Sequence, residues 1–457
     1  MSYKIDLSGL SREGEVSLTQ QLVERFRRAI DEGELEPGEK LPPTRELAAE
    51  VGVNHLTAAR VYRKLAELGY VTASVGRGTF VRAADAAASG ALAEPATARV
   101  DLELNFPLLP GQTEELTSSL DALLQSGAMP GALRPASVSG TAASRAAAAR
   151  LLRRDGWQPA PERVLFAGNG RQALAGVLAA LVPAGERLAV EALTYPVVKG
   201  IAARLGIRLV PVAVDDRGMR PDALRATGSL AAVYLQTTLH NPLGITMDDD
   251  RRRALAAVLA ERDLMALEDQ VNGYLDESQP PLAGVAPERT VLVDSLSKRL
   301  SAGLSVGFAV APVPWTDRVA AAVRSGGWTP SGFALAAAAQ WVEDGTAERV
   351  QRAKRADAAE RQRLVAERLA GFTVHANPAA YHCWWELPPS WQPDTFVVAA
   401  ARRGIAVSPA AAFAVAPTAA PNAVRLALGS PSRQALADAL DVLARLARSH
   451  PDDVGIE

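Results

Sequence analysis

Short apolar runs alternate with helical stretches between residues 164 and 310, and this alternation restricts the folds open to the chain. Strands that alternate with helices form an open, mainly parallel sheet covered on both faces. The sequence therefore predicts a seven-stranded α/β sheet with strands at Val164–Phe166, Leu188–Glu191, Leu209–Val212, Ala232–Leu235, Leu264–Glu268, Val291–Asp294 and Gly307–Val310.

The rest of the chain divides into further parts, since 457 residues are too many for a single core. From about Trp315 onward, helices mix with strands such as His382–Leu387 and Val424–Leu428, which predicts a smaller α+β part. Ala83–Ala98 is rich in Ala with Gly, Ser and Pro and lacks apolar periodicity, as linkers do. We predict an N-terminal domain over 14–82, a linker over 83–100 and a domain over 101–450, with a large part over about 101–314 and a small part over about 315–450.

The N-terminal domain has the pattern of three helices and a hairpin. Leu18–Ile30 has apolar residues at helical spacing. We expect Thr44 to cap a second short helix that Gly52 ends, and Asn54 to cap a third. Tyr70–Val81 then has the pattern of a two-stranded hairpin. This order predicts a winged helix-turn-helix.

Positive charge is concentrated in the second half of this domain. Residues 1–82 carry 12 Lys/Arg and 12 Asp/Glu, whereas 54–82 carries five basic residues against Glu67 alone, a net charge of +4. Because phosphates attract such a surface, we expect the third helix and the hairpin to face double-stranded DNA.

A second group of polar residues follows the predicted strands of the large part. Lys298, in Ser295-Leu296-Ser297-Lys298, lies just beyond one strand, and Asp269 ends another. The carboxyl ends of parallel strands border the ligand crevice of an α/β sheet. Pyridoxal phosphate (PLP) needs an amine that holds its aldehyde as a Schiff base and an acid that keeps its ring nitrogen protonated. We therefore predict PLP on Lys298, with Asp269 at the ring nitrogen.

Other residues match the remaining needs of PLP. Asn241, in His-Asn-Pro-Leu-Gly, is the expected donor to the ring oxygen, and Tyr195 is the expected stacking ring. Arg425, in a late strand, would hold a carboxylate of a small amino compound. A helix that begins after the first strand offers N–H groups to a phosphate. The expected phosphate site consists of Gly170, Arg171, Gln172 and Ser295.

Each of these residues also has an ordinary structural explanation. Asp269 and Asn241 could cap loops, Tyr195 could belong to the core and Arg425 could form a surface ion pair. The single cysteine, Cys383, is expected to be a buried thiol, and it excludes an internal disulfide framework. No signal-peptide core or long apolar run is present, so we expect a cytoplasmic protein without a membrane partner. We predict no metal site.

The run Gly38–Val81 resembles the GntR family of winged-helix regulators, in its Arg-Glu-Leu-Ala, its Leu-Gly and its GRGTFV hairpin. The resemblance implies that Arg45 anchors a phosphate or base and that Gly76 and Arg77 at the wing tip reach the minor groove. Many relatives have Ser-Arg in place of Asn54-His55, so their base preference does not carry over. The alternative is a winged helix used for protein contacts. The residues implied to enter the major groove are Asn54, His55, Thr57 and Arg60.

The second group of residues occurs in the chain order and rough spacing of fold-type-I aminotransferases, which the chain resembles from about Asp101 to its end. Joined to the GntR-like head, the whole chain resembles the MocR subfamily of bacterial regulators. The resemblance implies a winged helix-turn-helix fused to a fold-type-I PLP-binding fold. It also implies a homodimer in a head-to-tail arrangement.

Three features of the chain depart from the family pattern. Ser305 stands where the family has an arginine for the cofactor phosphate, and Val271 and Asn272 stand where it has a tyrosine. The loop Arg134–Gly140 has no aromatic residue. We therefore expect looser cofactor binding and a weakened catalytic set, unless Arg171 or Arg299 replaces the missing arginine.

Three functions remain open at this point. The first is a transcriptional regulator that responds to PLP, alone or with an amino compound. The second is a PLP-dependent aminotransferase with an accessory DNA-binding head. The third is a sensor that has lost PLP and binds another ligand.

Overall fold

A computed structural model describes the chain in two compact units, Met1–Gly90 and Ala91–Glu457. The predicted wing tip, Gly76-Arg77, and the predicted linker up to residue 97 lie outside the described residues. The structure describes residues 18–31, 34–35, 39–67, 70–74, 78–81, 98–154, 156–303, 305–416 and 420–451.

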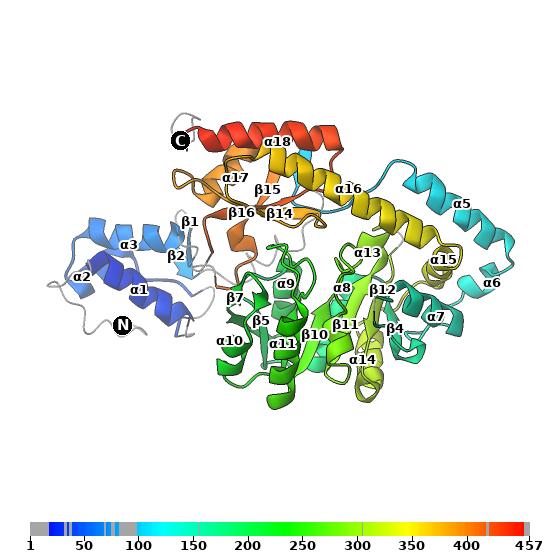
Figure 1. Ribbon diagram of the computed structural model, residues 1–457. Helices are drawn as coiled ribbons and strands as arrows, with labels where there is room; N and C mark the ends of the chain where they lie inside the picture. The colour runs from blue at the N-terminus through cyan, green and yellow to red at the C-terminus, as the bar shows by residue number, and fades with distance from the viewer. Residues whose placement is uncertain are drawn as a thin grey trace. The chain divides into compact units, whose positions relative to one another are not determined.

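The N-terminal unit is a small helical fold with a two-stranded hairpin (Figure 1). Leu22, Phe26, Val61 and Leu65 are fully buried in its core. The predicted order of helices and hairpin is confirmed, but Thr44 does not cap the second helix, because Pro43 occupies that position. The elements are α1 (Leu18–Asp31), α2 (Thr44–Val51), α3 (His55–Glu67), β1 (Val71–Ser74) and β2 (Gly78–Val81).

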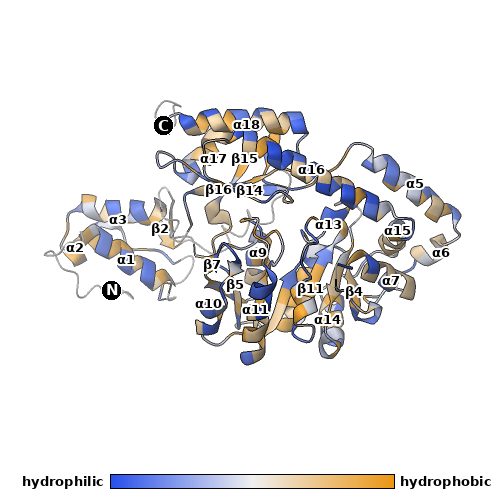
Figure 2. Cartoon of the chain, viewed as in Figure 1, coloured by the Kyte–Doolittle hydropathy of each residue, from blue (hydrophilic) through white to orange (hydrophobic). Residues whose placement is uncertain are grey.

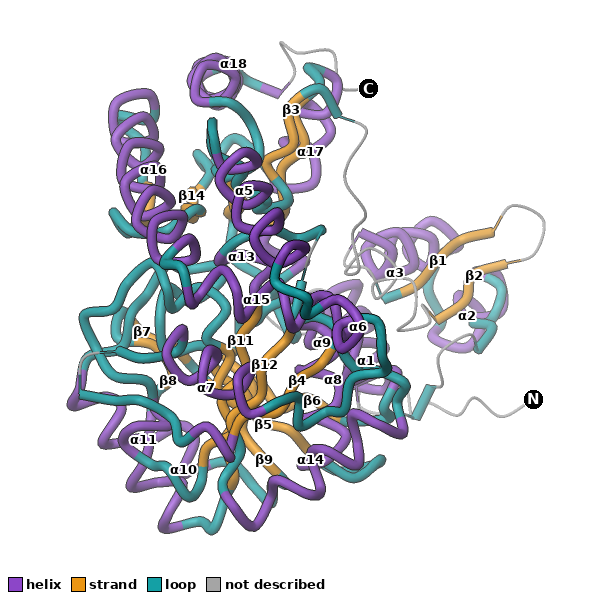
Figure 3. Tube along the Cα trace, turned by 90° about the vertical axis from the view of Figure 1, so that its right-hand side faces the viewer, coloured by secondary structure: helices purple, strands orange, loops and turns teal. Residues whose placement is uncertain are grey.

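A seven-stranded sheet forms the centre of the second unit (Figures 1 and 3). Its order is β4-β12-β11-β10-β9-β5-β6, and β12 alone runs against its two neighbours, so the predicted mainly parallel sheet is confirmed. The strands are strongly hydrophobic (Figure 2), as expected for a sheet buried on both faces. They are β4 (Val164–Ala167), β5 (Arg187–Glu191), β6 (Arg208–Val212), β9 (Ala232–Leu235), β10 (Met265–Asp269), β11 (Thr290–Ser295) and β12 (Gly307–Val310).

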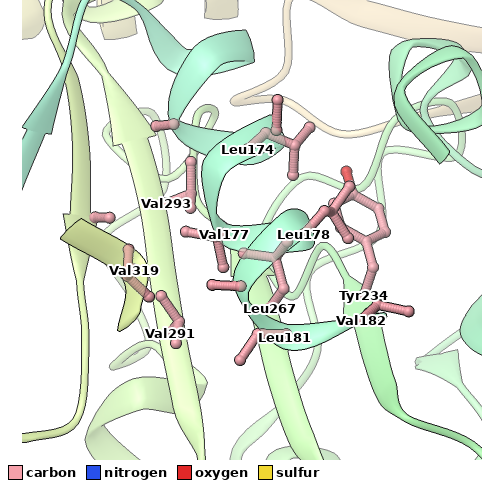
Figure 4. Packing of buried hydrophobic residues seen from close by; sticks show 14 of the residues in the cluster. Leu174, Val177, Leu178, Leu181, Val182, Tyr234, Leu267, Val291, Val293 and Val319 are labelled. Carbon is pink, nitrogen blue, oxygen red and sulfur yellow. The ribbon is translucent and has the colours of Figure 1, made fainter. Parts of the chain in front are cut away.

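Alternate residues of each strand pack against helices on opposite faces. On one face, Val291 and Val293 of β11 meet Val177 of α8 (Gly170–Leu181), as Figure 4 shows. Leu292 faces the other way. The helices around this sheet are α5 (Gln112–Gln125), α6 (Met129–Ala132), α7 (Ala142–Leu151), α9 (Pro196–Arg204), α10 (Pro221–Ala226), α11 (Asp249–Glu261), α12 (Leu282–Val285) and α13 (Leu296–Arg299), with the hairpin β7 (Val214–Asp215) and β8 (Gly218–Met219).

The large part extends further along the chain than the predicted limit near Trp315. Helix α14 (Val313–Ser325) packs on α8 through Val319 and Val323, and α15 (Gly332–Glu343) packs on α7. Apolar faces on both helices cover the large sheet, so α14 and α15 pack with the large part of the unit. Helix α16 (Thr346–Arg368) then leads from α15 to the small part (Figure 1).

The small part is a five-stranded sheet in the order β13-β14-β16-β15-β3. Its edge strand β3 comes from the start of the unit, where we predicted the large part, and pairs in parallel with β15. Cys383 is 1% exposed in this core, and burial raises the pKa of its thiol to about 12. The elements are β3 (Val100–Leu102), β13 (Val374–Ala376), β14 (His382–Glu386), β15 (Ile405–Pro409), β16 (Ala423–Ala427), α17 (Pro393–Arg402) and α18 (Arg433–Arg448).

Candidate functional site

The parallel strands bring the predicted pocket residues to one edge of the large sheet. Asp269 ends β10 and Ser295 ends its parallel neighbour β11, while Lys298 follows in α13. Asn241 and Tyr195 lie in the loops after β9 and β5. Because these strands are parallel, all of these segments leave the sheet at the same edge.

Asp269 is buried in a hydrogen-bond network. Tyr234 Oη and Gln236 Nε2 donate to Asp269 Oδ2 at 2.9 and 3.0 Å, and the Val271 amide donates to Oδ1 at 3.1 Å. Burial raises the pKa of Asp269 to about 6 despite these bonds, because the carboxylate loses its hydration. A cation against Asp269 would stabilise the carboxylate, which suits a protonated ring nitrogen.

Lys298 lies partly buried beneath a segment of main chain. Its Nζ atom donates to the Asn105 carbonyl and lies 4.3 Å from the centroid of the Phe106 ring. Burial lowers the pKa of Lys298 to about 7, and the charges of Arg171 and Arg425 lower it further in the same direction. A substantial fraction of the amine is thus unprotonated at neutral pH, the form that attacks an aldehyde.

Asn241 and Tyr195 complete the inner part of the site. The main-chain N–H of Asn241 donates to Gln236 Oε1 at 2.9 Å, which connects its loop to the hydrogen-bond network of Asp269. Asn241 Oδ1 is buried and has no hydrogen-bond partner within the described part of the chain. Burial raises the pKa of Tyr195, and Arg171 beside it acts in the opposite direction. A buried side-chain amide oxygen without a partner can be satisfied by a hydrogen bond from a bound polar group.

The predicted phosphate site is only partly available. Asn169 caps α8 and accepts the Gln172 amide at 2.9 Å, so that N–H group is already used. A Cβ atom on Gly170 would lie 2.9 Å from Ser295 Oγ, so the glycine lets the hydroxyl approach the start of α8. Arg171, in the first turn, is exposed. Gly170, Arg171 and Ser295 are left as donors at a helix N-terminus.

Arg425, on β16, is 7% exposed. Its Nη2 atom donates to the Glu103 carbonyl at 2.6 Å and to Ser408 Oγ at 3.1 Å, and its guanidinium lies 5.2 Å from the Phe413 ring. Nε is buried without a partner among the described residues. Burial lowers the pKa of Arg425 to about 10, so the side chain stays charged at neutral pH.

The departures from the family pattern have clear structural consequences. Ser305 Oγ contacts Ser297 Oγ. Arg299 is 1% exposed and pairs with Asp294 at 2.6 Å, so the suggestion that it replaces the phosphate arginine was wrong. Tyr274 is buried among Leu239, Tyr381 and other apolar residues, and therefore does not replace the missing tyrosine.

Sequence reasoning missed two residues that hold Asp269. Tyr234 has the pattern of a core residue of β9, and Gln236 follows that strand as an ordinary loop residue. The available signal was the position of Gln236 at a strand end, next to the strand that ends in Asp269.

The start of α3 is stabilised by its own side chains. Asn54 Oδ1 accepts the Thr57 amide at 2.7 Å and the Thr57 hydroxyl at 2.9 Å, so the predicted cap is confirmed. His55 Nε2 lies 2.8 Å from Thr44 Oγ1, a contact that joins α3 to α2. These side chains therefore use part of their hydrogen-bonding capacity to stabilise the N-terminal unit.

Other residues of this unit face solvent. Arg45 and Arg60 are exposed, and Arg60 lines a groove of about 530 Å³ against α1 together with Arg63 and Lys64. Leu56, in the first turn of α3, is 69% exposed. An exposed leucine at this place is a candidate for apolar contact with a thymine methyl group, which the sequence reading missed.

Two properties of the described residues bear on possible ligands. They contain no group of three His, Cys, Asp or Glu side chains that could hold a metal ion. None of their helices combines the length and apolar character needed to cross a membrane.

Comparison with known proteins agrees with this two-part architecture. Residues 97–443 match the model of aminotransferase class I and II, and residues 18–81 match that of bacterial regulatory proteins of the gntR family. The chain belongs to the class I and II aminotransferase family. Its organisation, with a GntR-type helix-turn-helix at the N-terminus, is that of a helix-turn-helix transcriptional regulator of the MocR type.

The similarity extends over most of the chain. The HTH-type transcriptional regulator YdeF of Bacillus subtilis is 28% identical over 441 residues, 95% of each chain. The HTH-type pyridoxine biosynthesis transcriptional regulator PdxR of Corynebacterium glutamicum is 28% identical over 67% of this chain and 69% of its own. The α-aminoadipate aminotransferase LysN of Thermus thermophilus, in complex with N-(5'-phosphopyridoxyl)-L-leucine, has a TM-score of 0.70 at 23% identity, over 79% of this chain and 94% of its own.

Proposed function

We propose that this regulator binds operator DNA through its N-terminal unit and PLP through its aminotransferase-like domain, and that PLP is its effector. In this proposal, Lys298 binds the aldehyde of PLP covalently and Asp269 pairs with the ring nitrogen. When bound, PLP supplies an electrophilic aldehyde that also reacts with amino compounds. Asn241 would bind the ring oxygen, Tyr195 would stack on the ring, and Gly170, Arg171 and Ser295 would hold the phosphate.

The observation that carries the proposal is that an amine and a buried carboxylate lie at the same edge of the sheet. Asp269 is 5% exposed, and within the described part of the chain its hydrogen-bond partners are Tyr234, Gln236 and the Val271 amide, none of them a cation, although a buried carboxylate is costly without one. Lys298 follows the neighbouring strand. A ligand with both an aldehyde and a protonated ring nitrogen suits this pair.

Arg425 extends the proposal to an amino compound. Its charged guanidinium and its unpartnered Nε atom suit the carboxylate of such a compound, which an arginine holds through two parallel bonds. The effector would then be PLP together with an amino acid or a related amino carboxylate.

A homodimer is part of the proposal, since fold-type-I pockets take residues from a second subunit. Leu108, Leu124 and Leu133 are 62, 53 and 74% exposed, which supports an interface over this stretch. Sedimentation of the purified protein tests this, and Leu133→Glu should lower the dimer fraction.

The regulator proposal is preferred over the aminotransferase alternative for a specific reason. Asn272 stands at a family tyrosine position and donates to the Leu239 carbonyl at 3.2 Å. Ser305 stands at the position of the family arginine for the phosphate, and its hydroxyl contacts Ser297. Weak retention of the cofactor suits a reversible sensor better than a catalyst. Many turnovers with an amino acid and an oxo acid would favour the alternative.

Absorption spectroscopy and gel shifts test the proposal together. The purified protein should develop a visible absorption band with PLP, and Lys298→Ala should abolish it. Lys199→Ala is the matched control, because Lys199 is also a partly buried lysine of lowered pKa, about 8, but donates to the carbonyls of Ala412 and Ala414 instead. PLP should change operator affinity in the unaltered protein and in the control, but not in Lys298→Ala. Operator affinity that ignores PLP would refute the sensor role.

A further inference from the structure

The segment Glu103–Phe106, here called the strap, contacts two cations of the candidate site through its main chain. Arg425 Nη2 donates to the Glu103 carbonyl at 2.6 Å, and Lys298 Nζ donates to the Asn105 carbonyl. The Phe106 ring adds a cation–π contact to Lys298 at 4.3 Å. The strap thus joins the two groups that the proposed function assigns to the cofactor and to a carboxylate.

Hydrogen bonds to the loop after β16 fasten the strap. Asn105 Oδ1 accepts the Gly429 amide at 3.0 Å. Ser430 Oγ accepts the Phe106 amide at 3.1 Å and donates to the Leu104 carbonyl. The side chains of Asn105 and Ser430 therefore tie the strap to this loop, and neither side chain is hydrogen-bonded to Lys298 or Arg425.

The strap and a ligand would compete for the same hydrogen atoms. A lysine bound covalently to an aldehyde no longer has the three N–H donors of an ammonium group, so its bond to the Asn105 carbonyl weakens or breaks. A carboxylate held by Nε and Nη2 of Arg425 needs one hydrogen atom of Nη2. Both hydrogen atoms of Nη2 are already donated, one to the Glu103 carbonyl and one to Ser408 Oγ. Carboxylates bind guanidinium more strongly than neutral carbonyls do.

The strap is also continuous with the chain that leads to the N-terminal unit. It directly follows β3, which covers only Val100–Leu102 and pairs at the sheet edge with β15. Fraying chain ends and regions with few buried apolar contacts are the parts of a fold that open most readily. The strap therefore follows the first described strand of the second unit, which is the strand of that unit nearest in the chain to the DNA-binding unit.

We propose that the strap is an internal competitor that occupies Lys298 and Arg425 in the absence of ligand, and that its release on ligand binding is the step that conveys occupancy to the DNA-binding unit. This inference rests on the proposed function. It adds to that function a named moving segment and the two bonds that ligand binding would break.

Substitutions in the fastening side chains test the inference. Ser430→Ala and Asn105→Ala should each loosen the strap without removing a pocket cation. Since each loses one or two hydrogen bonds, PLP should bind about fivefold more tightly, because less of the protein is in the closed form. Ser325→Ala is the matched control, because Ser325 lies at the exposed end of α14 and its Oγ donates to the Ala322 carbonyl of the same helix at 3.1 Å. It should leave the affinity unchanged.

Two further measurements separate competition from a merely structural role. Amide hydrogen exchange of residues 103–106 in the full-length protein should become faster when PLP is added. Without PLP, the operator affinity of Ser430→Ala should shift toward the value that the unaltered protein shows with PLP. A structural role alone would leave PLP affinity equal or weaker in both variants, and that result overturns the inference.

The outcomes also distinguish this inference from the proposed function. A visible band with PLP and unchanged amide exchange at residues 103–106 overturns the strap inference alone. A missing band in the unaltered protein overturns the proposed function, and the strap with it.

Discussion

Lys354 Nζ donates to the main-chain carbonyls of Lys298, at 2.9 Å, and of Leu300, at 2.8 Å. Lys354 lies on α16 and is fully buried. Burial lowers the pKa of Lys354 to about 7, and the nearby charge of Lys298 contributes in the same direction. The main chain at the end of the short helix α13, which carries Lys298, is therefore hydrogen-bonded to the side chain of a second lysine.

Lys354→Met should misplace Lys298 while leaving its side chain intact. We expect PLP affinity to fall about tenfold, since bonds from a charged donor to two carbonyls are lost. The pH dependence of the visible band should shift as well, which a general loss of stability would not cause. Lys199→Met removes a similar pair of carbonyl contacts away from α13 and should preserve both. Equal losses in the two variants would contradict a positioning role.

Asp269 should make the cofactor-free protein less stable as pH rises from about 4 to above 6. Its pKa is raised from 3.8 to about 6 in the fold, so the unfolded chain releases this proton first and the folded state is penalised. The penalty is about 3 kcal/mol once both states are ionised. Asp269→Asn should remove this fall and also weaken PLP binding.

Urea unfolding at pH 4 and 7.5 measures the effect of Asp269→Asn. Tryptophan fluorescence reports on the second unit alone, because all seven tryptophans of the chain lie beyond residue 150. The variant should gain stability relative to the unaltered protein at pH 7.5 and little at pH 4. Parallel curves for the two proteins would show that Asp269 is not the titrating group.

Arg299 and Arg171 should have opposite phenotypes. Arg299→Ala leaves Asp294 as a buried charge without its ion pair and should cost about 3–5 kcal/mol of stability. Arg171→Ala, at an exposed position, should change stability little and lower PLP affinity about tenfold, if Arg171 holds the phosphate. Unfolding curves and PLP titrations of the folded variants check both. A drop in PLP affinity confined to Arg299→Ala would reverse the assignment.

Leu56 and Arg45 should affect operator binding in different ways. Leu56→Ala should reduce affinity about fivefold, if the side chain contacts a thymine methyl, without changing the salt dependence. Arg45→Ala should lower the slope of log affinity against log salt by about one, if it contacts a phosphate. Gel-shift titrations at several salt concentrations distinguish the two. An altered slope for Leu56→Ala would argue against an apolar contact.

The sequence predicted the large sheet well because its strands are short, buried and apolar on both faces. The sequence-based prediction failed for strands whose partners are distant in the chain and for amphipathic helices whose packing partner was unknown. The strand β3 has only three residues and its partner β15 begins some three hundred residues later, so no local pattern reveals the pairing. Helix α14 looked like the start of the small part, but Val319 and Val323 pack it on α8.

The candidate site could be predicted in its main residues but not in their partners. Lys298 and Asp269 follow strands, and strand ends are visible in the sequence. The bonds from Tyr234 to Asp269 and from Arg299 to Asp294 depend on side-chain directions, which periodicity does not give. Two arginines of similar sequence context, Arg171 and Arg299, therefore looked equivalent until the fold separated them.

The burial of Cys383 makes the chain suitable for site-specific dye labelling. A thiol that is 1% exposed, with a pKa of about 12, carries almost no thiolate at neutral pH, so maleimide reagents should leave the folded protein unmodified. Cysteines introduced at the exposed positions Glu50 and Asp121 would then be the only reactive ones. Energy transfer between dyes at these two places would follow the separation of the two units as PLP is added, without first removing a natural residue.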